Sequence, residues 1–181
     1  MDIFKQELTY DSDGNISISV QILDFYNKMK KWIPSENICS QYFKVQDLVL
    51  YLSIYPNGDD HEDRGNVSVF LMNETIKQVF ISCKLQIGNH EAKVLERGYL
   101  KPKEGYGFSD LCNHEAVIPY YKRDEDLVVT CKIMKLTTDK VVWDSYYELK
   151  EKLDETLANL DETRWKLILI GLGVQQQQQQ Q

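Results

Sequence analysis

Alternation of apolar and polar residues is the main pattern along this chain. Its clearest example carries Ile16, Ile18, Val20 and Ile22 at every second position, which is the spacing of a half-buried β-strand. Further short apolar runs, separated by Gly, Asn and Pro, occur at residues 42–45, 48–55, 67–72, 78–87, 91–99, 117–121 and 127–134. No helical periodicity interrupts them before Leu136. Many short strands at this spacing predict an all-β antiparallel sandwich or barrel and argue against alternating β and α elements.

The two ends of the chain follow other patterns. Residues 1–15 are polar and end in the turn signal Asp11-Ser-Asp-Gly-Asn, so we expect a polar N-terminal segment before a sandwich over residues 16–140. A helical segment is expected over residues 141–174. Residues 175–181 are all glutamine, a composition that cannot build a packed core, and we expect a disordered tail there.

The C-terminal segment has the signature of an amphipathic helix. Large apolar residues recur at helical spacing through a charged background, at Tyr146, Leu149, Leu153, Leu157 and Leu160. Ser145-Tyr-Tyr-Glu148 matches a capping box and Asp144 is an alternative cap, so the helix is predicted from about residue 145 to residue 170. Its apolar stripe packs either on its own sandwich or on another chain. Thr156 and Thr163 at the core positions of the repeat argue against a coiled coil.

Composition narrows the classes of partner. Aromatic residues make up 11% of the chain, led by 11 tyrosines, which suits both strands and a protein-recognition surface. The net charge of −7, without a visible basic face, argues against nucleic acid. The apolar stretch 165–174 is too short for a membrane span, which needs about 20 residues. The cysteines show no CxxC spacing and the N-terminus lacks a signal-peptide pattern, so we expect a reducing, cytoplasmic location.

The sequence offers no convincing catalytic or metal-binding constellation. Its histidines, His61, His90 and His114, all fall in predicted loops. Cys112 and His114 form the nearest Cys/His pair, but no orienting group accompanies them. The acidic loop 59–63 reads as solvated, and the Asp11–Gly14 turn lacks the glutamate that an EF-hand requires. No glycine-rich phosphate loop is present. We therefore expect a protein that is not an enzyme and that uses no metal or cofactor.

Several segments, in order, resemble the MATH (meprin and TRAF homology) domain. Residues 18–25 are similar to the family's alternating opening strand, residues 40–43 to its Ser-x-x-Phe segment, and residues 51–58 to its Pro-x-Gly run. Residues 67–71 are similar to its Leu-Ser-Val-Tyr-Leu strand, residues 106–111 to its aromatic-Gly-Phe turn, and residues 126–133 to its closing Cys-containing strand. Tyr51 replaces the family's tryptophan in the third segment. The resemblance covers roughly residues 16–135. It implies a TRAF-like antiparallel β-sandwich of seven or eight strands that docks proteins, often in ubiquitin-linked or signalling assemblies.

The resemblance also implies a peptide-binding groove. Members similar to the cullin-ligase substrate adaptors bind extended peptides in a shallow groove on one sheet, and the matching positions here are Phe70, Cys83, Tyr99, Tyr106 and Phe108. A protein partner is therefore expected, held as an extended peptide segment. Three alternatives stay open: the aromatic residues are ordinary core, the protein oligomerises through its C-terminal helix, or the chain is a targeting domain cut from a ligase or deubiquitinase.

Overall fold

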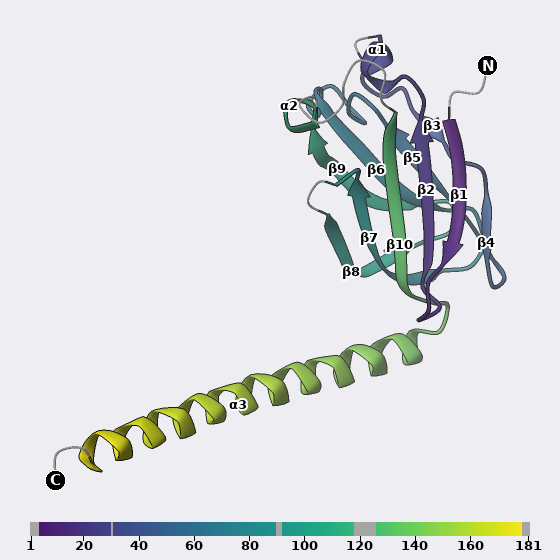
Figure 1. The fold of residues 1–181 in the computed structure, drawn as a ribbon. Coiled ribbons are helices and arrows are strands. Elements are labelled where there is room, and N and C mark those ends of the chain that lie inside the picture. The colour runs from purple at the N-terminus through teal and green to yellow at the C-terminus, as the bar shows by residue number, and fades with distance from the viewer. Residues whose placement is uncertain (1–3, 30, 90–91, 118–125, 179–181) are drawn as a thin grey trace. The chain divides into compact units, whose positions relative to one another are not determined.

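The computed structural model describes residues 4–29, 31–89, 92–117 and 126–178, and it contains two compact units. The first is Met1–Thr138 and the second is Asp139–Gln181. In the first unit, two antiparallel sheets stack face to face (Figure 1). This arrangement confirms the all-β sandwich that the alternating pattern predicts.

One sheet, here called sheet A, joins strands from both ends of the first unit. Its spatial order is β1 (Phe4–Tyr10), β2 (Ile16–Ile22), β10 (Leu127–Thr137), β7 (Val79–Ile87) and β8 (Lys93–Leu100). Every neighbouring pair is antiparallel. β8 therefore lies at one edge of sheet A and β1 at the other.

The second sheet, sheet B, supplies the other layer. Its order is β3 (Ile38–Cys39), β5 (Leu48–Tyr55), β6 (Asn66–Asn73) and β9 (Gly105–Asn113), and the short strand β4 (Phe43–Val45) also pairs with β5. The helices α1 (Phe25–Met29) and α2 (His114–Val117) lie at one end of the sandwich (Figure 1). Of the expected apolar run 117–121, Val117 ends α2 and residues 118–121 lie outside the described residues.

The core lies between the two sheets and follows the alternation of the sequence. In β5 the side chains of Leu48, Leu50, Leu52 and Ile54 are fully buried, whereas Tyr51 and Tyr55, at alternate positions, are half-buried on the outer face. The same alternation buries Ile18, Val20 and Ile22 of β2 from the opposite sheet. Burial of apolar surface on this scale is the main source of stability for such a fold.

Asn73 is a buried polar residue that joins two turns next to the core. Its Nδ2 donates to the carbonyl oxygens of Lys77 at 2.7 Å and Lys101 at 3.2 Å, and its Oδ1 accepts from the Thr75 amide at 3.1 Å. Its backbone also bonds to the turn before β9, because the Lys103 amide donates to the Asn73 carbonyl at 2.9 Å. Asn73 thereby fixes the point at which β9 enters sheet B.

The expected polar N-terminal segment contains a strand. β1 pairs along its whole length with β2, from Phe4 opposite Ile22 to Tyr10 opposite Ile16. Most of its side chains are exposed, which explains why residues 1–15 lack the pattern of a buried strand. The described residues therefore contain ten strands, where the sequence predicted seven or eight, because β1, the very short β3 and β9 lie outside the expected apolar runs.

The C-terminal helix, α3 (Lys140–Gln178), is longer than predicted at both ends. Its cap is Asp139, whose Oδ1 accepts from the amides of Val141 at 2.8 Å and Val142 at 3.3 Å, so neither Asp144 nor Ser145 begins the helix. The helix is assigned through Gln178. Residues 179–181 lie outside the described residues.

Candidate interaction surface

β9 is the edge strand of sheet B, and its register decides where its side chains point. Among the described residues β9 pairs with β6 alone, with Tyr106 opposite Leu71 and Phe108 opposite Val69. Residues directly opposite in an antiparallel pair project to the same face. Tyr106 and Phe108 therefore lie on the inner side of the sheet, like the buried Leu71 and Val69, but at the edge of the sandwich, where Tyr106 is still 44% exposed.

Two glycines of β9 occupy the outer face between these aromatic residues. A Cβ at Gly107 would overlap the Val69 carbonyl oxygen and lie 2.6 Å from the Phe70 Cα, and a Cβ at Gly105 would overlap the Met72 sulfur. At Gly107, where the overlap is with backbone atoms of β6, only glycine allows such a close approach of the two strands. The sequence Gly-Tyr-Gly-Phe thus holds β9 tightly against β6 and leaves its outer side without side chains.

The edge strand of sheet A, β8, lies beside β9. A Cβ at Gly98 of β8 would lie 3.5 Å from Cδ1 of Tyr106, so the tyrosine ring rests against the β8 backbone. Further along β8, the Lys93 Nζ lies 2.7 Å from Oδ1 of Asp110, 2.6 Å from the Asp110 carbonyl oxygen and 5.4 Å from the centre of the Phe108 ring. These contacts close the side of the sandwich between β8 and β9.

The electrostatics of this edge are set by one ion pair. The hydrogen bond from Lys93, together with its positive charge, holds the pKa of the Asp110 carboxyl below its usual value. The cation also lies over the Phe108 ring, within the range of a cation–π contact. The edge therefore combines exposed aromatic area at Tyr106 with a charged pair at its other end.

The five residues expected to form the groove fall on different faces. Tyr106 and Phe108 come together on β9. Phe70 lies on the outer face of sheet B, where its ring contacts that of Tyr55 edge-on, with 5.9 Å between centroids. Tyr99 lies on the outer face of sheet A, and its ring centroid is 5.4 Å from that of Phe80.

Cys83 does not belong to any surface, and its expected role in the groove is corrected here. Its side chain is 0% exposed and belongs to the core cluster between the sheets, opposite Leu95 in the β7–β8 register. The fully buried thiol has no access to a bound peptide. Strand alternation explains this, because Lys84, the next residue along β7, points to the outer face instead.

Gly98 and Lys93 are residues of this edge that the motifs did not indicate. A glycine inside a strand signals a bulge or a close approach of another chain segment. Both features are present, because the β7–β8 register shifts between Ile81 and Cys83 and Tyr106 lies against Gly98. For Lys93 the sequence carried no signal, since its partner Asp110 lies on another sheet.

A family model described as "MATH domain" matches residues 17–133, which is more than half of the chain. The chain belongs to the MATH domain family. Comparison with curated proteins gives no match. Among solved structures, TRAF5 of Notothenia coriiceps is similar, with 16% sequence identity and a TM-score of 0.46 over 71% of this chain and 76% of that chain. As a MATH domain, the sandwich is a protein-interaction module of a family that is generally non-catalytic.

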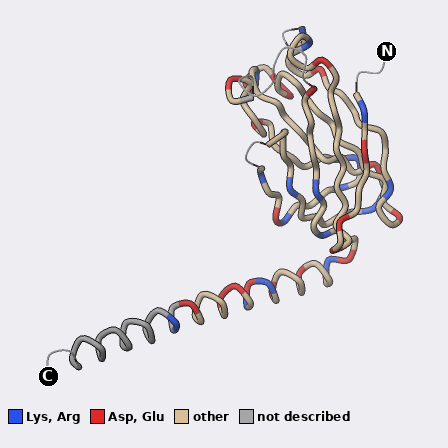
Figure 2. The backbone as a smooth tube through the Cα atoms, viewed as in Figure 1, with Lys and Arg blue, Asp and Glu red and all other residues tan. Residues whose placement is uncertain are grey.

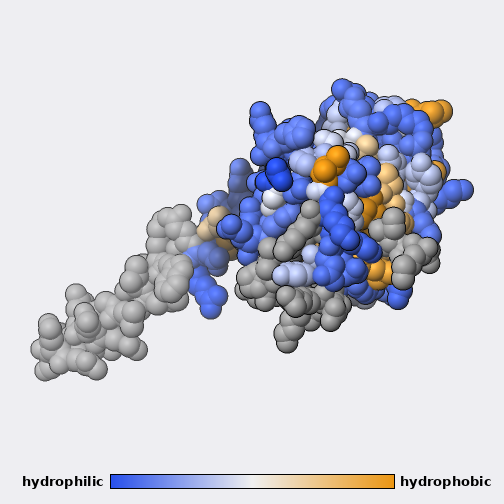
Figure 3. Space-filling view, turned by 90° about the horizontal axis from the view of Figure 1, so that it is seen from above, coloured by the Kyte–Doolittle hydropathy of each residue, from blue (hydrophilic) through white to orange (hydrophobic). Residues whose placement is uncertain are grey.

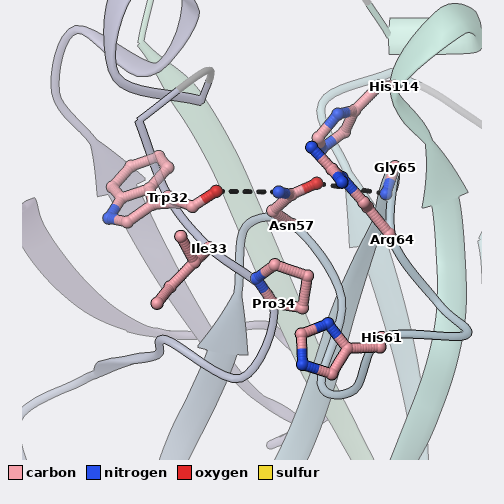
Figure 4. A pocket seen from close by; sticks show the side chains of 8 residues that line it. All are labelled: Trp32, Ile33, Pro34, Asn57, His61, Arg64, Gly65 and His114. Atoms are coloured by element: carbon pink, nitrogen blue, oxygen red, sulfur yellow. Dashed lines mark hydrogen bonds between the residues drawn. The ribbon is translucent and has the colours of Figure 1, made fainter.

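The MATH domain also has a cavity, at the end that carries α1 and α2. The visible surface there is mostly hydrophilic, with small scattered hydrophobic areas (Figure 3). Loops enclose a cavity of about 600 Å³, lined by Trp32, Ile33, Pro34, Asn57, His61, Arg64, Gly65 and His114 (Figure 4). Asn57 donates to the Trp32 carbonyl oxygen at 2.7 Å and accepts from the Gly65 amide at 3.1 Å. These bonds join the loops around the cavity, so the polar groups of Asn57 serve the fold.

Two further properties bear on the chemistry of the MATH domain. Within the residues that the structure describes, no three His, Cys, Asp or Glu side chains gather as a metal site would require. No helix in the described part of the chain is long and apolar enough to cross a membrane.

Proposed function

We propose that this MATH domain is an adaptor module that binds an extended peptide segment of a partner protein along the outer edge of β9. The peptide adds a strand to sheet B and exchanges backbone hydrogen bonds with β9. The observation that carries the proposal is the exposed ring of Tyr106 in a strand that pairs on one side only in the described part of the sheet. Proteins normally protect such edges, and an aromatic side chain there favours a docking role.

The two faces of β9 support the binding of alternate peptide side chains. Successive side chains of an added strand point to opposite sides. One set meets Tyr106 and Phe108 beside β8. The other set meets the outer side at Gly107, next to Phe70, and the Met72 side chain beside Gly105. Three of the five residues expected from the family resemblance thus contribute to one binding edge from two sides.

A cytoplasmic location is part of this proposal. Cys39, Cys83, Cys112 and Cys131 are all free thiols, and Cys39 is exposed. A reducing compartment preserves exposed thiols, whereas secreted domains of this size commonly pair their cysteines.

Selection of a displayed random-peptide library against the full chain, followed by calorimetric titration of the selected peptides, tests the binding edge. Replacement of Tyr106 by alanine is expected to lower peptide affinity by at least about tenfold, as for a central aromatic anchor. The free energy of unfolding is expected to change by less than about 1 kcal/mol, because Tyr106 is 44% exposed. A collapse of stability would identify Tyr106 as a core residue and reject the proposal.

Tyr10 provides a matched control. It is an exposed tyrosine in β1, the edge strand at the far side of sheet A, and 64% of its surface is accessible. The variant Tyr10→Ala is expected to bind the selected peptides with wild-type affinity. Equal losses in both variants would show that the peptides bind aromatic surface without regard to β9.

A further inference from the structure

α3 presents an unusually long apolar stripe to solvent. The helix has 39 residues, which corresponds to about 58 Å at 1.5 Å per residue. Large side chains along one face are exposed: Tyr146 by 40%, Leu149 by 67%, Leu153 by 58%, Leu157 by 52% and Leu160 by 61%. Contiguous exposed apolar area of this kind marks an interaction site.

The stripe follows a seven-residue repeat. With Tyr146 placed at position a of a heptad, Leu153 and Leu160 also occupy position a, and Leu149 and Thr156 occupy position d. The sequence continues the repeat with Leu167 and Val174 at a and Ile170 at d, so it extends over more than four heptads of the helix. A repeat of this length is typical of coiled-coil association.

Thr156 interrupts the apolar seam in sequence, but its hydroxyl is already satisfied. Its Oγ1 donates to the carbonyl oxygen of Lys152 one turn earlier, at 2.7 Å. Burial of a hydroxyl is costly only when its hydrogen bond is lost. Thr156 can therefore enter a seam without an unpaired polar group, and this answers the objection at one of the two threonine positions.

Charges flank the seam in separate rows. In the described part of α3, the charged residues at e and g, which border the seam, are all basic: Lys150, Lys152 and Arg164. Those at b, c and f between Tyr146 and Asp161, on the remaining faces, are acidic: Glu148, Glu151, Asp154, Glu155 and Asp161. Lys140 also falls at b, but it precedes the repeat. Acidic and basic residues are interspersed along the described part of the helix (Figure 2). Each side of the helix therefore carries one basic row next to one acidic row.

These rows are complementary to those of a second α3. At 100° per residue, the g and c side of one helix meets the e and b side of a parallel neighbour. Glu148 at c then faces Lys150 at e of the neighbour, and Lys152 at g faces Asp154 at b. The closest flanking pairs, g to the following e, are Ser145 with Lys150 and Lys152 with Leu157, which avoids contacts between like charges.

An antiparallel arrangement is less favourable. It sets e against e and g against g, where every charged residue of the described helix is basic, so any charged contact there is repulsive. After the first heptad, position a carries leucine at residues 153, 160 and 167. Position d of the same heptads carries the β-branched residues Thr156, Thr163 and Ile170. This combination favours more than two strands, and Leu157 at e widens the seam in the same direction.

We propose that α3 is a self-association helix, and that copies of this chain join through it as a parallel homo-oligomer. The partner is a second copy because the seam and its charge rows complement themselves. Such an assembly holds several sandwich units together and raises the effective concentration of their binding edges. The proposal does not depend on where a peptide binds, because its evidence lies entirely within α3.

Sedimentation equilibrium of the full chain over a series of concentrations tests the proposal. The expected mass is a multiple of the 21.2 kDa chain. The variant Leu153→Glu places a charge at position a and is expected to return the protein to monomer mass. Ala158→Glu introduces the same charge at position f, away from the seam, and is expected to keep the wild-type mass.

Disulfide cross-linking tests the parallel direction. In a Cys39→Ser background, Leu149→Cys brings identical residues together in a parallel, in-register oligomer and is expected to give a covalent dimer under mild oxidation. Ala158→Cys at position f is expected to stay monomeric on a denaturing gel. An oligomer that resists cross-linking at residue 149 would overturn the parallel arrangement.

Other occupants of the seam have distinct outcomes. A wild-type chain that stays monomeric at every concentration would overturn the proposal. If that monomer also sediments with phosphatidylserine vesicles, and Leu153→Glu abolishes the binding, the stripe is a membrane-surface helix instead. If the monomer does not bind vesicles and Leu153→Glu lowers its unfolding temperature, the stripe packs within its own chain.

Discussion

The ring of Tyr106 on β9 rests against the backbone of Gly98 on β8, and this contact links the edge strands of the two sheets. A Cβ at Gly98 would lie 3.5 Å from Cδ1 of the tyrosine and 3.0 Å from Cγ2 of Ile81. The space above Gly98 is therefore filled from both sheets. A side chain at residue 98 competes directly with the aromatic residue on which the proposed binding edge depends.

Replacement of Gly98 by valine is expected to displace Tyr106 and to crowd Ile81. Overpacking of this kind lowers the free energy of unfolding by about 1–3 kcal/mol, which urea denaturation measures. Peptide affinity is expected to fall with it, because Tyr106 loses its position. Val94→Ile adds a methyl group to an exposed position of the same strand and is expected to change neither quantity. A stable Gly98→Val variant with wild-type affinity would contradict the contact.

The Lys93–Asp110 pair is expected to make part of the stability dependent on acid pH. The pKa of Asp110 is lowered in the folded state by the hydrogen bond from Lys93. Its contribution is therefore present at neutral pH and is lost as the pH falls below the ordinary value of 3.8 through the folded value. In Lys93→Met, the pKa of Asp110 followed by carbon-detected NMR is expected to rise toward 3.8. An unchanged titration would mean that the pair does not form in solution.

The cysteines are expected to react with a thiol reagent in a fixed order. Cys39 is exposed and reacts first, whereas burial raises the pKa of the half-buried Cys112 thiol and slows its reaction. Cys83 and Cys131 are 0% exposed, and the hydrogen bond that the Cys131 thiol makes to Cys83, together with burial, raises the pKa of Cys131. Both are expected to react only when the protein unfolds. Labelling of Cys83 in the native protein, read by mass spectrometry, would contradict its position in the core.

Replacement of Asn73 by alanine is expected to destabilise the entry of β9 into sheet B. The variant removes the donor that bonds the carbonyl groups of Lys77, Leu100 and Lys101, and the bond to Leu100 is buried. A loss of about 1–3 kcal/mol in unfolding free energy is expected for such groups, together with faster hydrogen exchange at the Lys103 amide. Asn89→Ala changes an exposed asparagine in another turn and is expected to have little effect. Equal stability of the two variants would show that the Asn73 side chain is dispensable.

Local alternation was sufficient to locate most of the sandwich. β2, β5, β6, β7 and β10 carry apolar residues at every second position, because one face of each strand packs in the core. β1 lacks that pattern, since it is exposed on most positions and is held by its backbone pairing with β2. The strand conformation of β1 depends on its pairing with β2, so the alternation of its own sequence does not predict it.

The start of α3 shows a similar limit. Asp139 caps the helix, but the following Val141 and Val142 are β-branched residues that give no helical signal. The apolar spacing becomes regular only from Tyr146, which is why the predicted start falls several residues late. The capping side chain and not the periodicity sets this boundary.

Alternation did not predict the strand of Tyr106 and Phe108, which the family resemblance marks as a turn, but the sequence by itself located most of the other strands, because their core faces repeat every two residues. It also placed Phe70 and Cys83 in strands, but not on a face of the sandwich. Only the tertiary structure buried Cys83, turned Tyr99 away from Tyr106, and brought β8 beside β9. Those outcomes depend on the register and packing of strands that are distant in sequence, where each position is fixed by contacts that no local pattern contains.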